Sequence, residues 1–252
     1  MSLRALITND DGVSAEGLRV LTEVALAAGL EVTVAAPHED RSGTAAMLSA
    51  LESGGRLVYD RAEVAGCKAY GVHASPAMIA FAGVRGAFGE VPDVVLSGIN
   101  HGANTGRAVI HSGTVGAALT GASHGVPGLA VSLAGAPVTH WDTARVVTAR
   151  ALDWFLQHRA GLVAVNVNVP DVAPDGLLGL RSADFAGFGS VQAEIGEFGE
   201  GFVTMAFTEL GEEVAQDSDL GLLRKGWATL SSMRTPIVAD LDLPAGLDQG
   251  LE

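Results

Sequence analysis

The sequence predicts an α/β fold, a Rossmann-like doubly wound and mainly parallel sheet with a small β-rich C-terminal extension. Three observations predict it. Short apolar runs alternate with helix-like segments as far as residue 170. Of the 252 residues, 48% are hydrophobic, and a further 33 are glycine. Such a chain has a large core and many tight backbone turns, and its alternating elements are typical of a doubly wound sheet.

The first elements form a βαβ unit. Residues 3–8 are a short, mostly apolar run that Asn9-Asp10-Asp11-Gly12 ends, as expected of a buried strand entering a polar turn. A helix follows, with Ser14 as its expected N-cap and Gly29 as its stop. Residues 31–36 are the second strand. We therefore expect the two strands to be parallel, with a right-handed crossover.

The later elements continue this pattern. We expect an irregular pair of strands at 57–59 and 67–72, a helix over 76–88, a strand at 93–97, a helix over 112–124, a strand at 128–133, a helix from an Asp142 cap to about residue 158, and a strand at 162–169.

Past Pro170 the pattern changes to short segments rich in glycine and acidic residues. Residues 202–208 and 227–232 resemble strands, and a short helix is expected at 219–225. We therefore predict a Rossmann-like core at 1–170 and a β-rich extension, or arm for oligomerisation, at 171–252.

The charge balance excludes some classes of partner. Fifteen Lys and Arg against 29 Asp and Glu give a formal charge of −14, whereas nucleic-acid binding needs clustered cations. Nucleic-acid polymers and acidic membrane surfaces are therefore not expected partners. Residues 1–30 lack a secretory pattern, no run of 18 apolar residues occurs, and Cys67 is the single cysteine. We expect a cytoplasmic protein.

Four oxygen-bearing side chains follow predicted strands. Asp10 and Asp11 follow the first strand, Ser42 lies in the loop after the second, and Asn100 follows the strand that ends at Ser97. Because the carboxyl ends of parallel strands line the ligand crevice, these side chains are expected to converge. Hard oxygen ligands suit Mg²⁺ or Mn²⁺. Each loop taken alone is also compatible with an ordinary Asp or Asn turn.

A second feature is Ser112-Gly113-Thr114, at the start of a predicted helix of small residues. The positive N-terminus of a helix suits a phosphate, and Gly113 allows close approach of an anion. The alternative is that Ser112 only caps the helix. A P-loop and a G-x-G-x-x-G fingerprint after the first strand are both absent.

The motifs at these loops are shared with a known family. They are Thr8-Asn9-Asp10-Asp11-Gly12, Ala36-Pro37 with Arg41-Ser42-Gly43, Ser97-Gly98-Ile99-Asn100-His101-Gly102-Ala103-Asn104, and Ser112-Gly113-Thr114-Val115, with Asn166-Val167-Asn168-Val169-Pro170 further on. In this order and spacing the chain resembles the SurE family, the survival-protein-E type of 5′-nucleotidase.

The resemblance implies a metal-dependent phosphatase that hydrolyses nucleoside 5′-monophosphates to nucleoside and phosphate. It implies one divalent cation per subunit, Mg²⁺ or Mn²⁺, and a homodimer or homotetramer with exchanged C-terminal arms. Asp10, Asp11, Ser42 and Asn100 match the metal ligands, and we also predict the two aspartates to be the catalytic residues. The residues that match the phosphate-binding loops are Asn9, Gly43, Asn104, Ser112, Gly113 and Thr114.

Some positions depart from the family. The chain has His73-Ala74-Ser75-Pro76 where the family commonly has Gly-Thr-Pro before an Asp-Cys pair. Thr105-Gly106-Arg107 replaces Leu-Gly-Asp, and His111 replaces a common Tyr. These changes leave the metal loops intact and leave substrate choice and assembly open.

The leading hypothesis is hydrolysis of a phosphate monoester. The cation lowers the pKa of a bound water, one Asp acts as base, and residues 112–114 hold phosphate oxygens. Arg107, His101 and His111 are weaker candidates for charge stabilisation and for protonating the leaving group. Three alternatives remain open: a broader phosphatase, a short-chain exopolyphosphatase, and a non-catalytic nucleotide-binding module.

Overall fold

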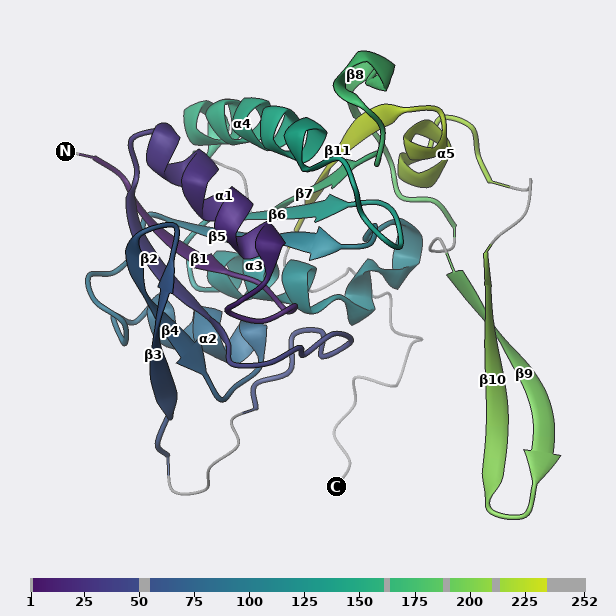
Figure 1. Ribbon diagram of the computed structural model, residues 1–252, viewed down its shortest axis with the longest axis horizontal. Coiled ribbons are helices and arrows are strands. Elements are labelled where there is room, and N and C mark those ends of the chain that lie inside the picture. The colour runs from purple at the N-terminus through teal and green to yellow at the C-terminus, as the bar shows by residue number, and fades with distance from the viewer. Residues whose placement is uncertain (1, 50–54, 161–163, 188–190, 210–213, 235–252) are drawn as a thin grey trace, which may run out of the picture.

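A computed structural model, shown in Figure 1, describes residues 2–49, 55–160, 164–187, 191–209 and 214–234. The strands are β1 (Arg4–Thr8), β2 (Glu31–Pro37), β3 (Tyr59–Val64), β4 (Cys67–Val72), β5 (Val94–His101), β6 (Gly128–Leu133), β7 (Ala164–Val169), β8 (Gly179–Ser182), β9 (Val191–Gly199), β10 (Phe202–Glu209) and β11 (Trp227–Met233). The helices are α1 (Glu16–Ala27), α2 (Pro76–Gly83), α3 (Gly113–Ser123), α4 (Trp141–His158) and α5 (Asp219–Arg224), with short 3₁₀ turns η1 (Gly106–His111) and η2 (Pro174–Gly176).

Nine of these strands form one sheet in the order β3-β4-β2-β1-β5-β6-β7-β11-β8. Strands β4, β2, β1, β5, β6 and β7 are parallel, while β3 runs antiparallel to β4 and β11 antiparallel to β7. The chain progresses outward on one side of β1 and then on the other, from β5 onward. The predicted doubly wound α/β fold is confirmed, and its topological switch point lies between β1 and β5.

Helices cover both faces of the sheet. Figure 1 shows α1 and α4 on one face and α2 and α3 on the other. Leu18 of α1 and Phe155 of α4 belong to one buried cluster, whereas Ile79 of α2 and Ala117 of α3 belong to another. The central strands are buried on both faces, which explains why they read as continuous apolar runs rather than alternating patterns.

Three details of the predicted helices were wrong. Ser14 does not cap α1, because a turn from Gly12 to Ala15 makes Ala15 the N-cap residue. Asp142 lies inside the first turn of α4 and His140 is the N-cap, although an acidic residue there still favours the helix dipole. The helix expected to reach residue 88 ends at Gly83, and Gly86 then takes a φ of 82° that a helix does not allow.

The C-terminal part divides into two kinds of structure. Strands β8 and β11 extend the main sheet beyond β7, whereas β9 and β10 pair only with each other in a separate two-stranded sheet. Figure 1 shows this hairpin projecting away from the body of the molecule. The strands expected near 202–208 and 227–232 and the helix expected near 219–225 are confirmed as β10, β11 and α5. The division at residue 170 stays a prediction, and residues 162–163 and 235–252 lie outside the described residues.

No helix among the described residues is both long enough and apolar enough to cross a membrane.

Candidate active site

The carboxylate of Asp10 lies at the carboxyl end of β1, inside the molecule, and the residue is 3% exposed. Thr114, in the first turn of α3, donates its hydroxyl to Oδ1 and its backbone N–H to Oδ2, the latter at 3.2 Å. The loop after β1 and the start of α3 therefore meet at one carboxylate.

Gly113 makes this approach possible. A Cβ at Gly113 would lie 2.8 Å from Oδ2 and 2.9 Å from Cβ of Asp10, and 3.1 Å from Oγ1 of Thr44. The first two distances are closer than a side chain tolerates, so glycine is required there. The close approach expected at Gly113 is present, and the negative group that approaches is the Asp10 carboxylate.

Burial makes the ionised forms of Asp10 and Asp11 costly. Burial raises the pKa of Asp10 to about 6, the hydroxyl of Thr114 lowers it, and the negative charge of Asp11 raises it further. Burial also raises the pKa of Asp11, and the nearby charge of Asp40 adds to this, while His101 opposes it. A divalent cation between these loops would stabilise both carboxylates in their ionised form, so the electrostatics fit the predicted metal.

The loop that carries Ser42 reaches the same place. The backbone N–H of Arg41 donates to the carbonyl oxygen of Asp10 at 2.7 Å. Ser42 is exposed, and its hydroxyl donates to Oδ1 of Asp40 at 2.7 Å. Gly43 follows with a φ of 75°. The structure thus places the Ser42 loop beside Asp10 but directs the hydroxyl of Ser42 to Asp40.

The end of β5 supplies the third side of the site. The backbone N–H of His101 donates to Oδ2 of Asp11 at 3.3 Å. The side-chain amide nitrogen of Asn100 donates to the carbonyl of Gly102 at 2.8 Å. The side-chain oxygen of Asn100 is therefore the atom that could bind a cation. Asn100 therefore lies next to a residue in contact with Asp11.

Asn9 precedes the two aspartates and is buried. Its amide nitrogen donates to the carbonyl of Gly12 at 2.9 Å, while its Oδ1 is buried and has no hydrogen-bond partner within the structure as described. A buried amide oxygen without a partner is costly. It lies next to the carboxylates, where a water or ligand donor would satisfy it.

Asn104 is held by the ends of β6 and β7. Its side chain donates to Oγ of Ser132 and its backbone N–H to Oδ1 of Asn168, both at 2.8 Å. Asn166 and Asn168 each donate to its carbonyl oxygen, at 2.8 and 2.9 Å. The alternation of asparagine with valine in β7 was the sequence signal for these anchors, whose positioning role the motif analysis missed.

Asp219 is a further residue that sequence reasoning missed. It is fully buried in α5 and accepts hydrogen bonds from the backbone N–H groups of Gly106 and Ala186, each at 2.8 Å. It thereby ties the C-terminal part of the chain to the loop after Asn104. The available signal was the pair Ser218-Asp219 at the start of a predicted helix.

The weaker candidates are exposed. Arg107 and His111 lie in η1, and the ring of His101 packs 5.3 Å from that of Trp141.

Ser112 is the N-cap of α3, and its hydroxyl accepts a hydrogen bond from the N–H of Val115 at 3.1 Å. The capping role that the sequence offered as the alternative for Ser112 is therefore present. The metal-ligand and phosphate-contact roles of all these residues stay predictions, although the segments that carry Ser42, Asn100 and Thr114 each contact Asp10 or Asp11.

The family model for "Survival protein SurE" matches residues 5–188. The chain belongs to the SurE family. The motif resemblance is therefore confirmed, and the match includes all of the loops described above.

Curated relatives and a solved structure agree with this membership. "5′-Nucleotidase SurE" of Aeromonas hydrophila is 41% identical over 181 residues, covering 71% of this chain and 70% of the relative. "5′-Nucleotidase SurE" of Methylocella silvestris is 36% identical over 248 residues, covering 93% and 94%. The crystal structure of the SurE protein from Aquifex aeolicus is 25% identical, covers 93% of this chain and 94% of its own, and superposes with a TM-score of 0.79.

Proposed function

We propose that this SurE family member is a metal-dependent phosphomonoesterase that hydrolyses nucleoside 5′-monophosphates to nucleoside and phosphate. The 5′-nucleotidase class rests on family membership and on the curated relatives. The observation that carries the proposed metal is the pair of carboxylates at Asp10 and Asp11, whose pKa values burial raises and whose surroundings offer oxygen ligands. One Mg²⁺ or Mn²⁺ per subunit would be held by Asp10, Asp11, Ser42 and Asn100.

The cation, when bound, supplies a Lewis acid for a phosphate oxygen and acidifies a water. Asp10 and Asp11 are the carboxylates available to take a proton from the attacking water. The water oxygen forms a bond to phosphorus as the bond from phosphorus to the 5′ oxygen breaks, and the 5′ oxygen takes up a proton, from the carboxylate or from solvent, to leave as the nucleoside hydroxyl. The start of α3 at Ser112, Gly113 and Thr114 offers a positive dipole for phosphate oxygens, while the backbone N–H groups of Ser112 and Thr114 donate to Val109 and Asp10.

A hollow of about 440 Å³ beside His101 is the proposed place for the nucleoside. Its lining includes Trp141, Pro137, Val138 and Glu16. An indole face suits stacking of a nucleobase, and a carboxylate suits a sugar hydroxyl or an exocyclic amine. This hollow adjoins the site through His101, whose backbone contacts Asp11.

The test is phosphate release from a substrate panel with several divalent cations. We expect Mg²⁺ or Mn²⁺ to stimulate release from nucleoside 5′-monophosphates and a chelator to abolish it. No release from any monophosphate with any cation would overturn the proposal, and tight nucleotide binding by calorimetry without turnover would favour a binding module. Faster release from polyphosphate or from simple phosphate esters would favour the exopolyphosphatase or the broader phosphatase.

We also propose a homodimer or homotetramer, located in the cytoplasm. The support for assembly is the projecting β9–β10 hairpin with its exposed apolar side chains. The net charge of −14 disfavours nucleic-acid polymers and acidic membrane surfaces as partners.

A further inference from the structure

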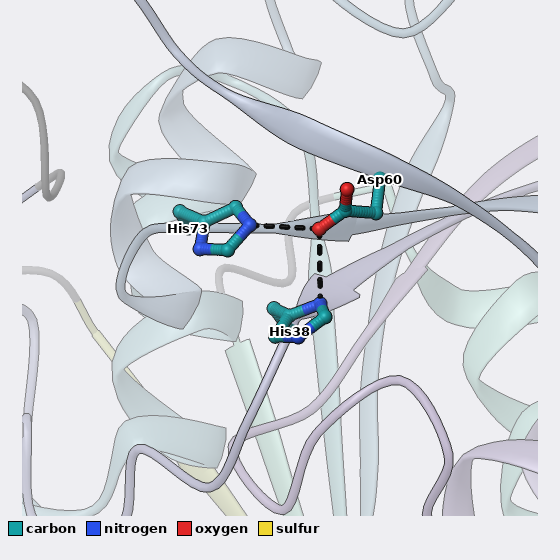
Figure 2. Close-up of side chains that lie close together, drawn as sticks. All are labelled: His38, Asp60 and His73. Atoms are coloured by element: carbon teal, nitrogen blue, oxygen red, sulfur yellow. Dashed lines mark hydrogen bonds and ion pairs between the residues drawn. The ribbon is translucent and has the colours of Figure 1, made fainter.

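A second polar cluster lies at the edge of the sheet, apart from the aspartates. Nε2 of His73 and Nδ1 of His38 lie 2.8 and 3.2 Å from Oδ2 of Asp60, and Figure 2 shows both rings directed at this carboxylate. We propose that His38, Asp60 and His73 form a second metal site, selective for a borderline transition metal such as Zn²⁺ and distinct from the oxygen site at Asp10 and Asp11.

The backbone fixes the three residues relative to one another. Pro37 at the end of β2 is paired with Val72 at the end of β4, so the residues that follow, His38 and His73, are neighbours at the ends of two parallel strands. The N–H of His38 donates to the carbonyl of Val72 at 2.8 Å, and that of His73 to the carbonyl of Val58 at 2.9 Å. Asp60 comes from β3, which pairs with β4. Ligands on three paired strands are well preorganised.

The spacing and chemistry fit a transition metal. Zinc binds imidazole nitrogen and carboxylate oxygen at about 2.0–2.2 Å, so two ligand atoms on a tetrahedral ion lie roughly 3.3–3.5 Å apart. The three ligand atoms here all lie within 4.8 Å of one another, and a small movement of the stacked rings would bring them onto one ion. Imidazole ligands favour Zn²⁺, Co²⁺, Ni²⁺ or Cu²⁺ over Mg²⁺.

The cluster is open to solution. The side chains of His38, Asp60 and His73 are 48%, 59% and 30% exposed, so an ion can enter and complete its coordination with water. No residue is shared with the predicted oxygen site. His73 stands in the segment where the sequence departs from the family pattern, and the proposed hydrolysis uses none of the three side chains.

The test is titration of the whole protein with Zn²⁺ or Co²⁺ in the presence of excess Mg²⁺. The Mg²⁺ is added to occupy the proposed oxygen site at Asp10 and Asp11, because Mg²⁺ prefers oxygen ligands. We expect calorimetry to find one Zn²⁺ per subunit and Co²⁺ to give the visible absorption of a four- or five-coordinate ion. His73→Gln and Asp60→Asn should each weaken this binding by at least about 100-fold, since loss of an outer-shell partner already costs about 10- to 100-fold. His158→Gln is the matched control, because His158 bonds to the carbonyl of Trp154 in its own helix and lies outside the cluster.

A second measurement needs no variant. Zn²⁺ should protect His38 and His73, but not His158, from histidine-specific acylation mapped by mass spectrometry. Absence of Zn²⁺ binding to the wild-type chain, equal binding by His73→Gln and the wild type, or uniform acylation of the three histidines would each overturn the proposal. None of these outcomes bears on the hydrolysis proposed at Asp10, which a Mg²⁺-dependent assay tests separately.

Discussion

Asp10 and Phe198 occupy environments opposite to those that their chemistry favours. The carboxylate of Asp10 is buried at 3% exposure, whereas the ring of Phe198, on the β9–β10 hairpin, is 74% exposed. Nearby apolar residues of the hairpin are also exposed, with Ile195 at 65% and Met205 at 56%. Both placements cost free energy in an isolated subunit. The proposed cation would stabilise the carboxylate of Asp10, and the proposed assembly would cover the apolar side chains of the hairpin.

The largest effect is expected from Asp10→Asn. This change removes the charge that would hold the cation and keeps the size of the side chain. We expect kcat/KM for a nucleoside monophosphate to fall by about 1,000-fold, since removal of one group that stabilises a transition state commonly costs 10²–10³ and the cation contributes more. Steady-state phosphate release with saturating Mn²⁺ measures it, and the His158→Gln variant is the control. Activity within about threefold of wild type would remove Asp10 from the site.

The next largest effect is the pH dependence of the free energy of unfolding that the Asp10 carboxyl causes. The pKa of Asp10 in the folded chain is about 6, above its usual value of 3.8, so the folded state holds this proton more tightly than the unfolded state. The metal-free protein should therefore lose stability as pH rises from about 4 to about 6, by about 3 kcal/mol for this group, and change little above that. Denaturant unfolding of wild type and Asp10→Asn in chelator isolates the contribution.

Added Mn²⁺ sharpens this result. Cation and proton compete for the carboxylate, so the stabilisation by Mn²⁺ should grow as pH rises through about 6 and should be absent in Asp10→Asn. A metal-free wild type whose stability matches that of Asp10→Asn at every pH would contradict the idea that burial of Asp10 is costly.

A smaller effect is expected from Gly113→Ala. The new Cβ would lie 2.8 Å from Oδ2 of Asp10, so α3 or the carboxylate must move. Overpacking of this kind costs about 1–3 kcal/mol, and the displaced carboxylate should also reduce activity. The matched control is Gly187→Ala, because a Cβ there meets no atom within 4 Å. Equal unfolding free energies for the two variants would show that the start of α3 is not tightly packed on Asp10.

The convergence at Asp10 could be predicted because it depends on topology alone. Once β1, β2 and β5 are recognised as parallel strands, the loops that follow them must leave the same edge of the sheet. The bonds from Arg41 to Asp10 and from His101 to Asp11 reflect this arrangement. A close approach at Gly113 was also predicted, but of a phosphate, whereas the group that lies against Gly113 in the structure is the Asp10 carboxylate.

The contacts that depend on exact register were not predictable. The His38, Asp60 and His73 cluster requires the antiparallel pairing of β3 with β4, and the expected strand stopped at residue 59. The contact from Gly106 to Asp219 joins residues 113 positions apart. No local pattern predicts the contact of Asp219 with Gly106, because it depends on how α5 packs against the rest of the fold.

The smallest effect on the stability of a subunit is expected at the hairpin. Phe198→Ser changes an exposed side chain, so the unfolding free energy at high dilution should change by no more than about 0.5 kcal/mol. If the apolar face of the hairpin contacts another subunit, the same change should shift sedimentation toward a smaller species. Glu197→Ser is the matched control on the opposite face of the same strand. A large loss of subunit stability would instead place Phe198 against its own chain, and unchanged sedimentation would remove it from the interface.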